Sequence, residues 1–171
     1  MPLKVNSPHL VAVDTNVALD FASGREIVIE AVATIRQRIG QRACCFPPTI
    51  VAELAHAADF GERPEKRRAA RRVLEQHRAW GFRLINFVSV GRGVVFQIAE
   101  RLRQQRLLPA EEVHDSLLVA EAALLGCSML LTSDEHLCGI DFERLSFELK
   151  AFDVTAPVMA TPREVVRKFF R

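Results

Sequence analysis

The sequence predicts an α/β fold in which a parallel sheet is covered by helices on both faces. Three observations support this prediction. Short apolar runs alternate along the chain with helical segments, which is the order of βαβ units. The runs are almost continuously apolar, as expected of strands that are buried on both faces. The 171 residues, 49% of them apolar, suffice for one domain with a substantial core.

The expected strands are short apolar runs that end at a carboxylate, a proline pair or a polar residue. Four of them lie at residues 9–14, 43–46, 83–87 and 128–132, and a fifth is expected at 146–152. The expected helices have apolar positions spaced by about four, an opening proline or a terminal glycine. They cover residues 15–21, 26–39, 50–60, a segment that opens at Pro64, and then 94–107, 111–125, 133–137 and 165–170.

Two helix starts carry recognisable signals. Thr49 is expected to cap the helix that begins at Ile50, since a threonine oxygen can accept from the free N–H groups of a first turn. Residues 161–164 read Thr-Pro-Arg-Glu, which is a capping box with proline at the first helical position.

Composition excludes several classes of protein. No apolar run reaches the roughly 18 residues of a membrane-spanning helix, and the first residues lack a signal core, so we expect a cytoplasmic protein without a membrane segment. The cysteines form no C-x-x-C pair and have no histidine at zinc-ligand spacing, so we expect buried thiols at Cys44, Cys45, Cys127 and Cys138. The net charge of +2 identifies no partner.

Four acidic residues stand where the predicted sheet would gather them. Asp14 ends the first strand, and Asp134 follows the fourth. Glu53 lies early in the helix after the second strand, and Asp115 early in the helix before the fourth. The carboxyl ends of parallel strands and the amino ends of the following helices share one edge, so we expect the four carboxylates to converge there.

Converging carboxylates repel one another, and a divalent cation relieves that repulsion. Mg²⁺ and Mn²⁺ prefer oxygen ligands, and water on such an ion can be activated as a nucleophile. The pattern therefore favours phosphodiester hydrolysis. Polar neighbours that could orient the acids or the water are Thr15, Asn16, Thr132 and Ser133. Each acid alone has an ordinary explanation as a cap, a turn residue or a solvated helix residue, so the prediction rests on the set.

A basic segment lies between Glu62 and Arg78, with seven cationic and three acidic side chains. It forms the centre of an elaboration at about residues 59–80 of a single domain that spans 1–171. The segment could attract an RNA backbone, dock an acidic partner segment or a second protomer, or form a solvated helix face. The candidate RNA contacts are Arg63, Arg67, Arg71 and Arg78.

The acid-bearing motifs together resemble those of the PIN domain, from about residue 10 to the end of the chain. They are Val-Asp14-Thr-Asn, Glu53 after a strand, His-Asp115-Ser-Leu-Leu-Val-Ala-Glu-Ala and Leu-Leu-Thr132-Ser-Asp134. One departure is Leu137, where the family often has an aromatic residue. The resemblance implies a three-layer α/β/α sandwich with a central parallel sheet of four to five strands.

The same resemblance implies a function. Many members of the family are Mg²⁺- or Mn²⁺-dependent ribonucleases, and many of these are VapC-like toxins of VapBC-type toxin–antitoxin pairs, commonly dimeric. It implies a catalytic and metal-binding role for Asp14, Glu53, Asp115 and Asp134, with Thr132 as a polar support. The implied partners are an RNA substrate, a cognate antitoxin and a second copy of the chain.

Other functions have less support. A non-catalytic RNA- or protein-binding module of the same fold remains the main alternative. No G-x-S-x-G motif marks a serine hydrolase. An aspartyl-phosphate phosphatase usually carries a second aspartate where this chain has Asn16. His114 and His136 lie near the expected acidic edge and are interpreted as surface residues, with RNA contact as the alternative.

Overall fold

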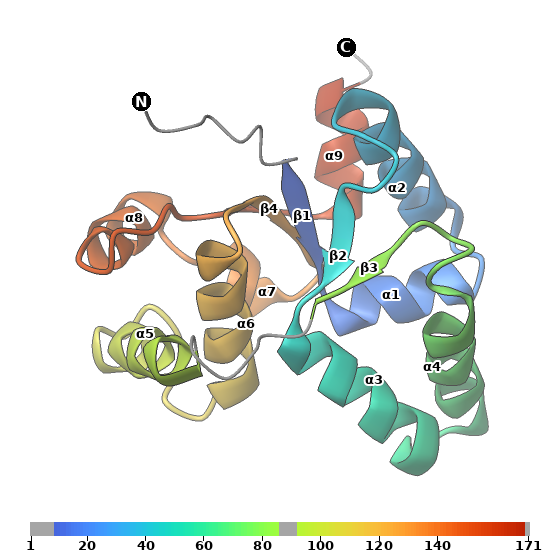
Figure 1. Ribbon diagram of the computed structural model, residues 1–171, viewed down its shortest axis with the longest axis horizontal. Helices are drawn as coiled ribbons and strands as arrows, with labels where there is room; N and C mark the ends of the chain where they lie inside the picture. The colour runs from blue at the N-terminus through green and yellow to red at the C-terminus, as the bar shows by residue number, and fades with distance from the viewer. Residues whose placement is uncertain (1–8, 86–91, 170–171) are drawn as a thin grey trace, which may run out of the picture.

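The computed structural model describes residues 9–85 and 92–169, and its centre is one parallel sheet (Figure 1). All strand pairs are parallel, and the strand order is β3-β2-β1-β4-β5. The strands are β1 (Leu10–Val13), β2 (Cys44–Phe46), β3 (Arg83–Leu84), β4 (Cys127–Leu131) and β5 (Val158–Ala160). The predicted third strand thus begins where expected, and its residues 86 and 87 lie outside the described residues.

The described residues form nine helices. They are α1 (Thr15–Ala22), α2 (Glu26–Arg38), α3 (Pro48–Phe60), α4 (Pro64–Gln76), α5 (Arg92–Gln104), α6 (Val113–Leu124), α7 (Glu135–Cys138), α8 (Phe142–Lys150) and α9 (Pro162–Phe169). In Figure 1, α2 and α9 lie to the right of the sheet, and α5, α6 and α8 lie to its left. Helix α4 packs against α3 and α1. The predicted three-layer α/β/α sandwich is confirmed.

Strand β1 is the centre of both the sheet and the core. Val11, Ala12 and Val13 are fully buried, which explains why the first apolar run has no polar alternation. The strand order reverses at β1, with β2 and β3 on one side and β4 and β5 on the other. In open parallel sheets, ligands gather outside the carboxyl ends of the strands at such a reversal. Asp14 follows the last residue of β1 directly.

The prediction of a strand at residues 146–152 is wrong. Residues 142–150 form α8, which begins with an Asp141 carboxylate that accepts from the N–H of Arg144. Leu145 and Leu149 are buried, whereas Phe147 is 75% exposed. A strand would turn all three side chains to one face, and a helix separates the phenylalanine from the two leucines. The fifth strand is β5 instead.

The two predicted helix starts have different outcomes. Helix α3 begins at Pro48, one residue before the expected cap, because a proline φ suits the first helical position. The capping box before α9 is confirmed, since the N–H of Thr161 donates to Glu164 at 2.9 Å and the N–H of Glu164 donates to Thr161 Oγ1 at 3.2 Å.

The expectation of buried thiols holds for three of the four cysteines. Cys44, Cys45 and Cys127 are buried in the sheet, and Cys138 is exposed at the end of α7. Within residues 9–85 and 92–169, no helix combines the length and apolarity that crossing a bilayer requires.

Candidate active site

Asp14 is held rigidly at the centre of the sheet edge. It is 7% exposed, and its carboxylate accepts from the N–H of Thr15 at 2.6 Å and from Thr132 Oγ1 at 2.7 Å. Burial raises the pKa of Asp14, the two hydrogen bonds oppose that rise, and the charges of Glu53 and Asp134 add to it. The Asp14 carboxyl therefore stands in a site where a cation would stabilise its ionised form.

Thr132 links the first strand to the fourth. Its hydroxyl donates to Asp14 and accepts from the N–H of Asp134 at 3.0 Å. Asp134 is the N-cap of α7, where its Oδ1 accepts from the N–H groups of His136 and Leu137 at 2.8 and 3.2 Å. One buried hydroxyl thus fixes the positions of two acids that follow neighbouring strands.

Glu53 reaches the same edge from α3. Thr15 Oγ1 donates to Glu53 Oε2, and His114 Nδ1 lies 3.1 Å from Glu53 Oε1. Thr15 begins α1 and His114 lies in the first turn of α6, so these contacts join three helices at the acidic edge. The carboxylate of Glu53 is therefore oriented by partners on either side.

Asp115, in the first turn of α6, has the clearest electrostatic perturbation of the four acids. Burial raises its pKa most, and the charges of Asp134, Asp14, Glu112 and Glu53 raise it further, to about 7. Burial and the charges of neighbouring acids thus act on the Asp115 carboxyl in the same direction, and a cation bound beside it would oppose both.

One cleft of about 860 Å³ is lined by all four acids. Its wall also includes Thr15 and Asn16. Ser133 is exposed and, like the buried Thr132, lies outside the lining, and its supporting role stays a prediction. The structure therefore brings together Asp14, Glu53, Asp115 and Asp134 from four separate parts of the chain.

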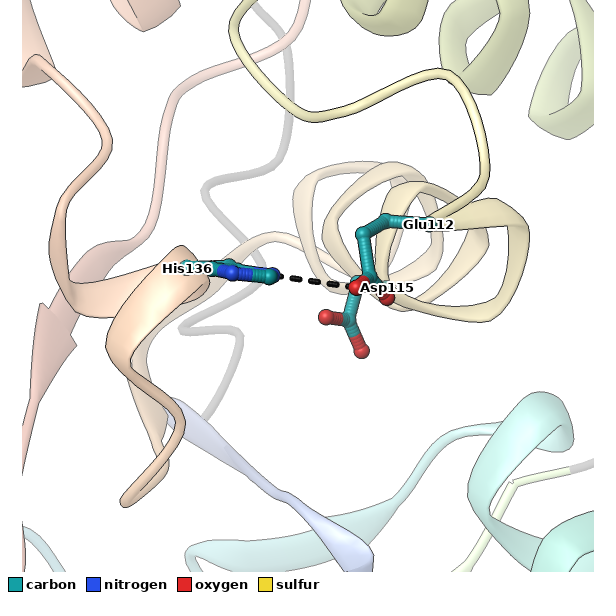
Figure 2. Close-up of side chains that lie close together, drawn as sticks. All are labelled: Glu112, Asp115 and His136. Carbon is teal, nitrogen blue, oxygen red and sulfur yellow. Dashed lines mark hydrogen bonds and ion pairs between the residues drawn. The ribbon is translucent and has the colours of Figure 1, made fainter.

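A tighter group of possible metal ligands was not expected from the sequence. Among the described residues, Glu112, Asp115 and His136 form the single group of three such side chains whose ligand atoms all lie within 4.8 Å. Figure 2 shows the three side chains turned toward one another, with His136 Nδ1 3.0 Å from Glu112 Oε1. The signal for Glu112 was its i, i+3 spacing from Asp115 at the start of a helix.

Glu121 is a second residue that the sequence analysis did not single out. It is buried on α6, and its carboxylate accepts from the Thr49 N–H at 3.0 Å and from Thr49 Oγ1 at 2.8 Å. Burial raises the pKa of Glu121, and the two hydrogen bonds oppose that rise. This carboxylate therefore joins the first turn of α3, the helix that carries Glu53, to α6, the helix that carries Asp115.

The donor chemistry of the edge fits a hard divalent cation. Carboxylate oxygens from Asp14, Glu53, Asp115 and Asp134 face one cleft, and such oxygens are the ligands that Mg²⁺ and Mn²⁺ favour. Burial raises the pKa of Asp14 and of Asp115, and the charges of neighbouring acids add to both shifts, so a cation at this edge would stabilise the ionised carboxylates.

The basic segment has a partly structural role. Arg67 donates to the carbonyl of Gly61 and Arg71 donates to that of Ala58, so both tie α4 to the end of α3. Arg63 and Arg78 are exposed. Lys66, which was not among the candidates, is the cation of this segment that lines the acidic cleft.

The chain is a parallel α/β sandwich whose four acids gather where the strand order reverses, at the carboxyl ends of the strands. This combination defines its class, an α/β protein with an acidic site at the edge of the sheet. A family model described as PIN domain matches residues 11–143, which is more than half of the chain, and the chain therefore belongs to the PIN domain family. PIN domains are generally nucleases that use a divalent metal ion.

A solved structure with the same fold is described as the crystal structure of VapBC2 from Rickettsia felis bound to a DNA fragment from their promoter. One of its chains is 11% identical in sequence, with a TM-score of 0.58, and the match covers 89% of this chain and 98% of that one. No protein among those with curated functions matches the sequence significantly.

Proposed function

We propose that this protein is a divalent-metal-dependent endoribonuclease and that the cleft of the four acids is its active site. The observation that carries the proposal is the convergence of carboxylates from β1, α3, α6 and the end of β4 on one cleft. A module that only binds RNA gains nothing from acids whose charges repel both one another and the phosphate backbone. The main alternative, a non-catalytic binding module, is therefore disfavoured.

In this proposal Asp14, Glu53, Asp115 and Asp134 hold Mg²⁺ or Mn²⁺. The bound ion would supply an activated water and neutralise charge on the phosphate. Thr132 keeps Asp14 and Asp134 in register, and Thr15 does the same for Glu53. Asn16, beside them on the cleft wall, offers an amide to a phosphate or to water.

The proposal extends to the setting of a toxin–antitoxin pair. The structurally similar chain comes from a complex named VapBC2, and the PIN domain is shared. We propose an antitoxin as the partner of this chain, which would hold the nuclease inactive until it is removed. A homodimer and a cytoplasmic location stay predictions.

Cleavage of RNA by the purified chain tests the nuclease. Wild type, Asp14→Asn and Asp115→Asn are compared with Mg²⁺, with Mn²⁺ and with EDTA. Asp153→Asn is the matched control, because Asp153 is exposed, lies outside the cleft and has a φ of 57° that asparagine tolerates.

We expect the two cleft variants to lose activity by at least about a hundredfold, since even outer partners of metal ligands matter by 10- to 100-fold. The control should cleave like wild type, and EDTA should abolish cleavage. Equal activity of Asp14→Asn, Asp115→Asn and wild type would refute the proposal. Tight RNA binding by wild type without metal-dependent cleavage would favour the binding module.

A further inference from the structure

Helix α3 continues the acidic cleft beyond Glu53 with an exposed aromatic pair. His56 and Phe60 lie on the same face of the helix as Glu53, at spacings of three and four residues. All three line the cleft. Phe60 is 72% exposed, and its ring centroid lies 5.2 Å from that of His56 at an interplanar angle of 39°. The aromatic faces therefore lie open at the end of the cleft away from the acids.

Packing against the described residues leaves the side chain of Phe60 largely uncovered. Other aromatic rings of this region are packed, as Phe82 shows by stacking on Phe46 at 4.9 Å. Phe60 instead leaves most of a large apolar side chain in water, and among the described residues its aromatic contact is with His56, which is itself exposed. Phe147 on α8 is exposed to a similar degree, so what distinguishes Phe60 is its place beside His56 in the lining of the acidic cleft.

We infer that the His56–Phe60 pair is a stacking subsite for an unpaired base of single-stranded RNA. The inference rests on the proposed nuclease function and adds a determinant of substrate class to it. Aromatic side chains bind any base through its π-face, so the subsite selects unpaired RNA rather than a particular sequence. A base within a duplex has no free face to offer.

Charge at this end of the cleft suits the backbone of the same strand. Lys66 lines the same cleft as the aromatic pair, and it belongs to the basic segment between Glu62 and Arg78. Glu62 also lines the cleft there, so the local preference for phosphate depends on Lys66 and the net positive charge of the segment. The four acids at the other end repel phosphate unless a cation is present.

The helix sets the distance between the two ends. Seven residues separate Glu53 from Phe60, which at a rise of about 1.5 Å per residue is roughly 10 Å. Stacked nucleotides are spaced by about 3.4 Å along one strand, and extended ones by more. The stacked base therefore belongs to a nucleotide one to three positions from the phosphate at the acids.

Fluorescence anisotropy with a labelled single-stranded RNA of about ten nucleotides measures the subsite, with Mg²⁺ present to neutralise the acids. For these binding measurements every protein, wild type included, also carries Asp14→Asn, so that the probe stays intact. Phe60→Ala should weaken binding by at least about fivefold, the lower end of the range for losing one stacked base. Phe60→Trp should bind as tightly as wild type or more tightly. Phe147→Ala, which removes an equally exposed phenylalanine from α8, is the matched control and should change nothing.

Abasic scanning separates direct stacking from an indirect effect. Removing one base at a time from the RNA should weaken binding to wild type at a single position close to the cleavage site. The same abasic position should have no effect on binding to Phe60→Ala, because the stacking partner is already gone. A duplex of the same sequence should bind wild type and Phe60→Ala equally.

Failure of the subsite is distinguishable from failure of the nuclease. If Phe60→Ala binds RNA like wild type while wild type cleaves it with metal, the subsite is refuted and the nuclease stands. If wild type neither binds nor cleaves RNA, both proposals are overturned.

Discussion

Replacing Glu121 by alanine should destabilise the join between α3 and α6. Pro47, which precedes α3, has no side-chain oxygen to cap the helix, and Glu121 supplies a carboxylate from another helix instead. Alanine leaves the N–H and the hydroxyl of Thr49 without this acceptor. The helix start then loses a negative charge that its dipole favours.

The expected loss of unfolding free energy combines two lost hydrogen bonds with the relief of the desolvation cost of one carboxylate. Each bond to a charged acceptor contributes about 1.5 kcal/mol at the lower end of the usual range, which suits the half-buried Thr49. Removing the buried carboxylate of Glu121 relieves the desolvation that raises its pKa, which offsets part of this sum. A net loss of about 2 kcal/mol corresponds to a fall in Tm of about 4–8 °C for a chain of this length.

Urea unfolding followed by circular dichroism measures the loss. Glu121→Gln keeps the shape and one acceptor oxygen, so its loss should be about half as large. Glu100→Ala removes an exposed helical glutamate and should change the free energy of unfolding by less than about 0.5 kcal/mol. A double-mutant cycle with Thr49→Val should give a coupling of about 1 kcal/mol for the hydroxyl bond. A loss for Glu121→Ala no larger than that of Glu100→Ala would refute the reasoning.

Three further predictions follow from the site and from α8. The pKa of Asp115 is raised to about 7, so the folded chain holds this proton more tightly than the unfolded chain, and the associated stability is present below about pH 4 and lost as the pH rises through 7. Urea unfolding between pH 4 and 8 should show that the free energy of unfolding of wild type falls as the pH rises, and that this fall is smaller for Asp115→Asn. An equal dependence on pH in the two proteins would contradict the prediction. Thr132→Val removes the hydroxyl that holds Asp14 and should lower RNA cleavage by 10- to 100-fold, with Thr132→Ser restoring most of it; retention of full activity by the valine variant would show that the link is dispensable. Leu145→Ala should cost about 2–5 kcal/mol in unfolding free energy and Phe147→Ala less than about 0.5 kcal/mol, whereas similar losses would contradict the helical assignment.

The sequence predicts the sheet edge well because its signals are local. Asp14 directly follows an apolar run, and a strand that is buried on both faces is expected to end where its apolar run ends. Asp134 lies three residues after the end of β4, beyond Thr132 and Ser133. From these positions the alternation of strands and helices suffices to bring the acids to one cleft, and their roles there stay predictions.

The parts that the sequence analysis missed depend on contacts between distant residues. Glu121 and Thr49 are 72 residues apart, and no local pattern connects a helical glutamate to the start of another helix. Strand β5 has three residues at the sheet border and gains its conformation from pairing with β4. The run 146–152 has mixed periodicity, which alone does not separate a strand from a helix.

The hydrogen bond between Thr132 and Asp14 joins residues 118 positions apart. A chain emerging from the ribosome presents Asp14 first and Thr132 only 118 residues later. The acidic cleft therefore cannot assemble on a nascent chain before β4 and the residues that follow it have been synthesised and have paired with β1.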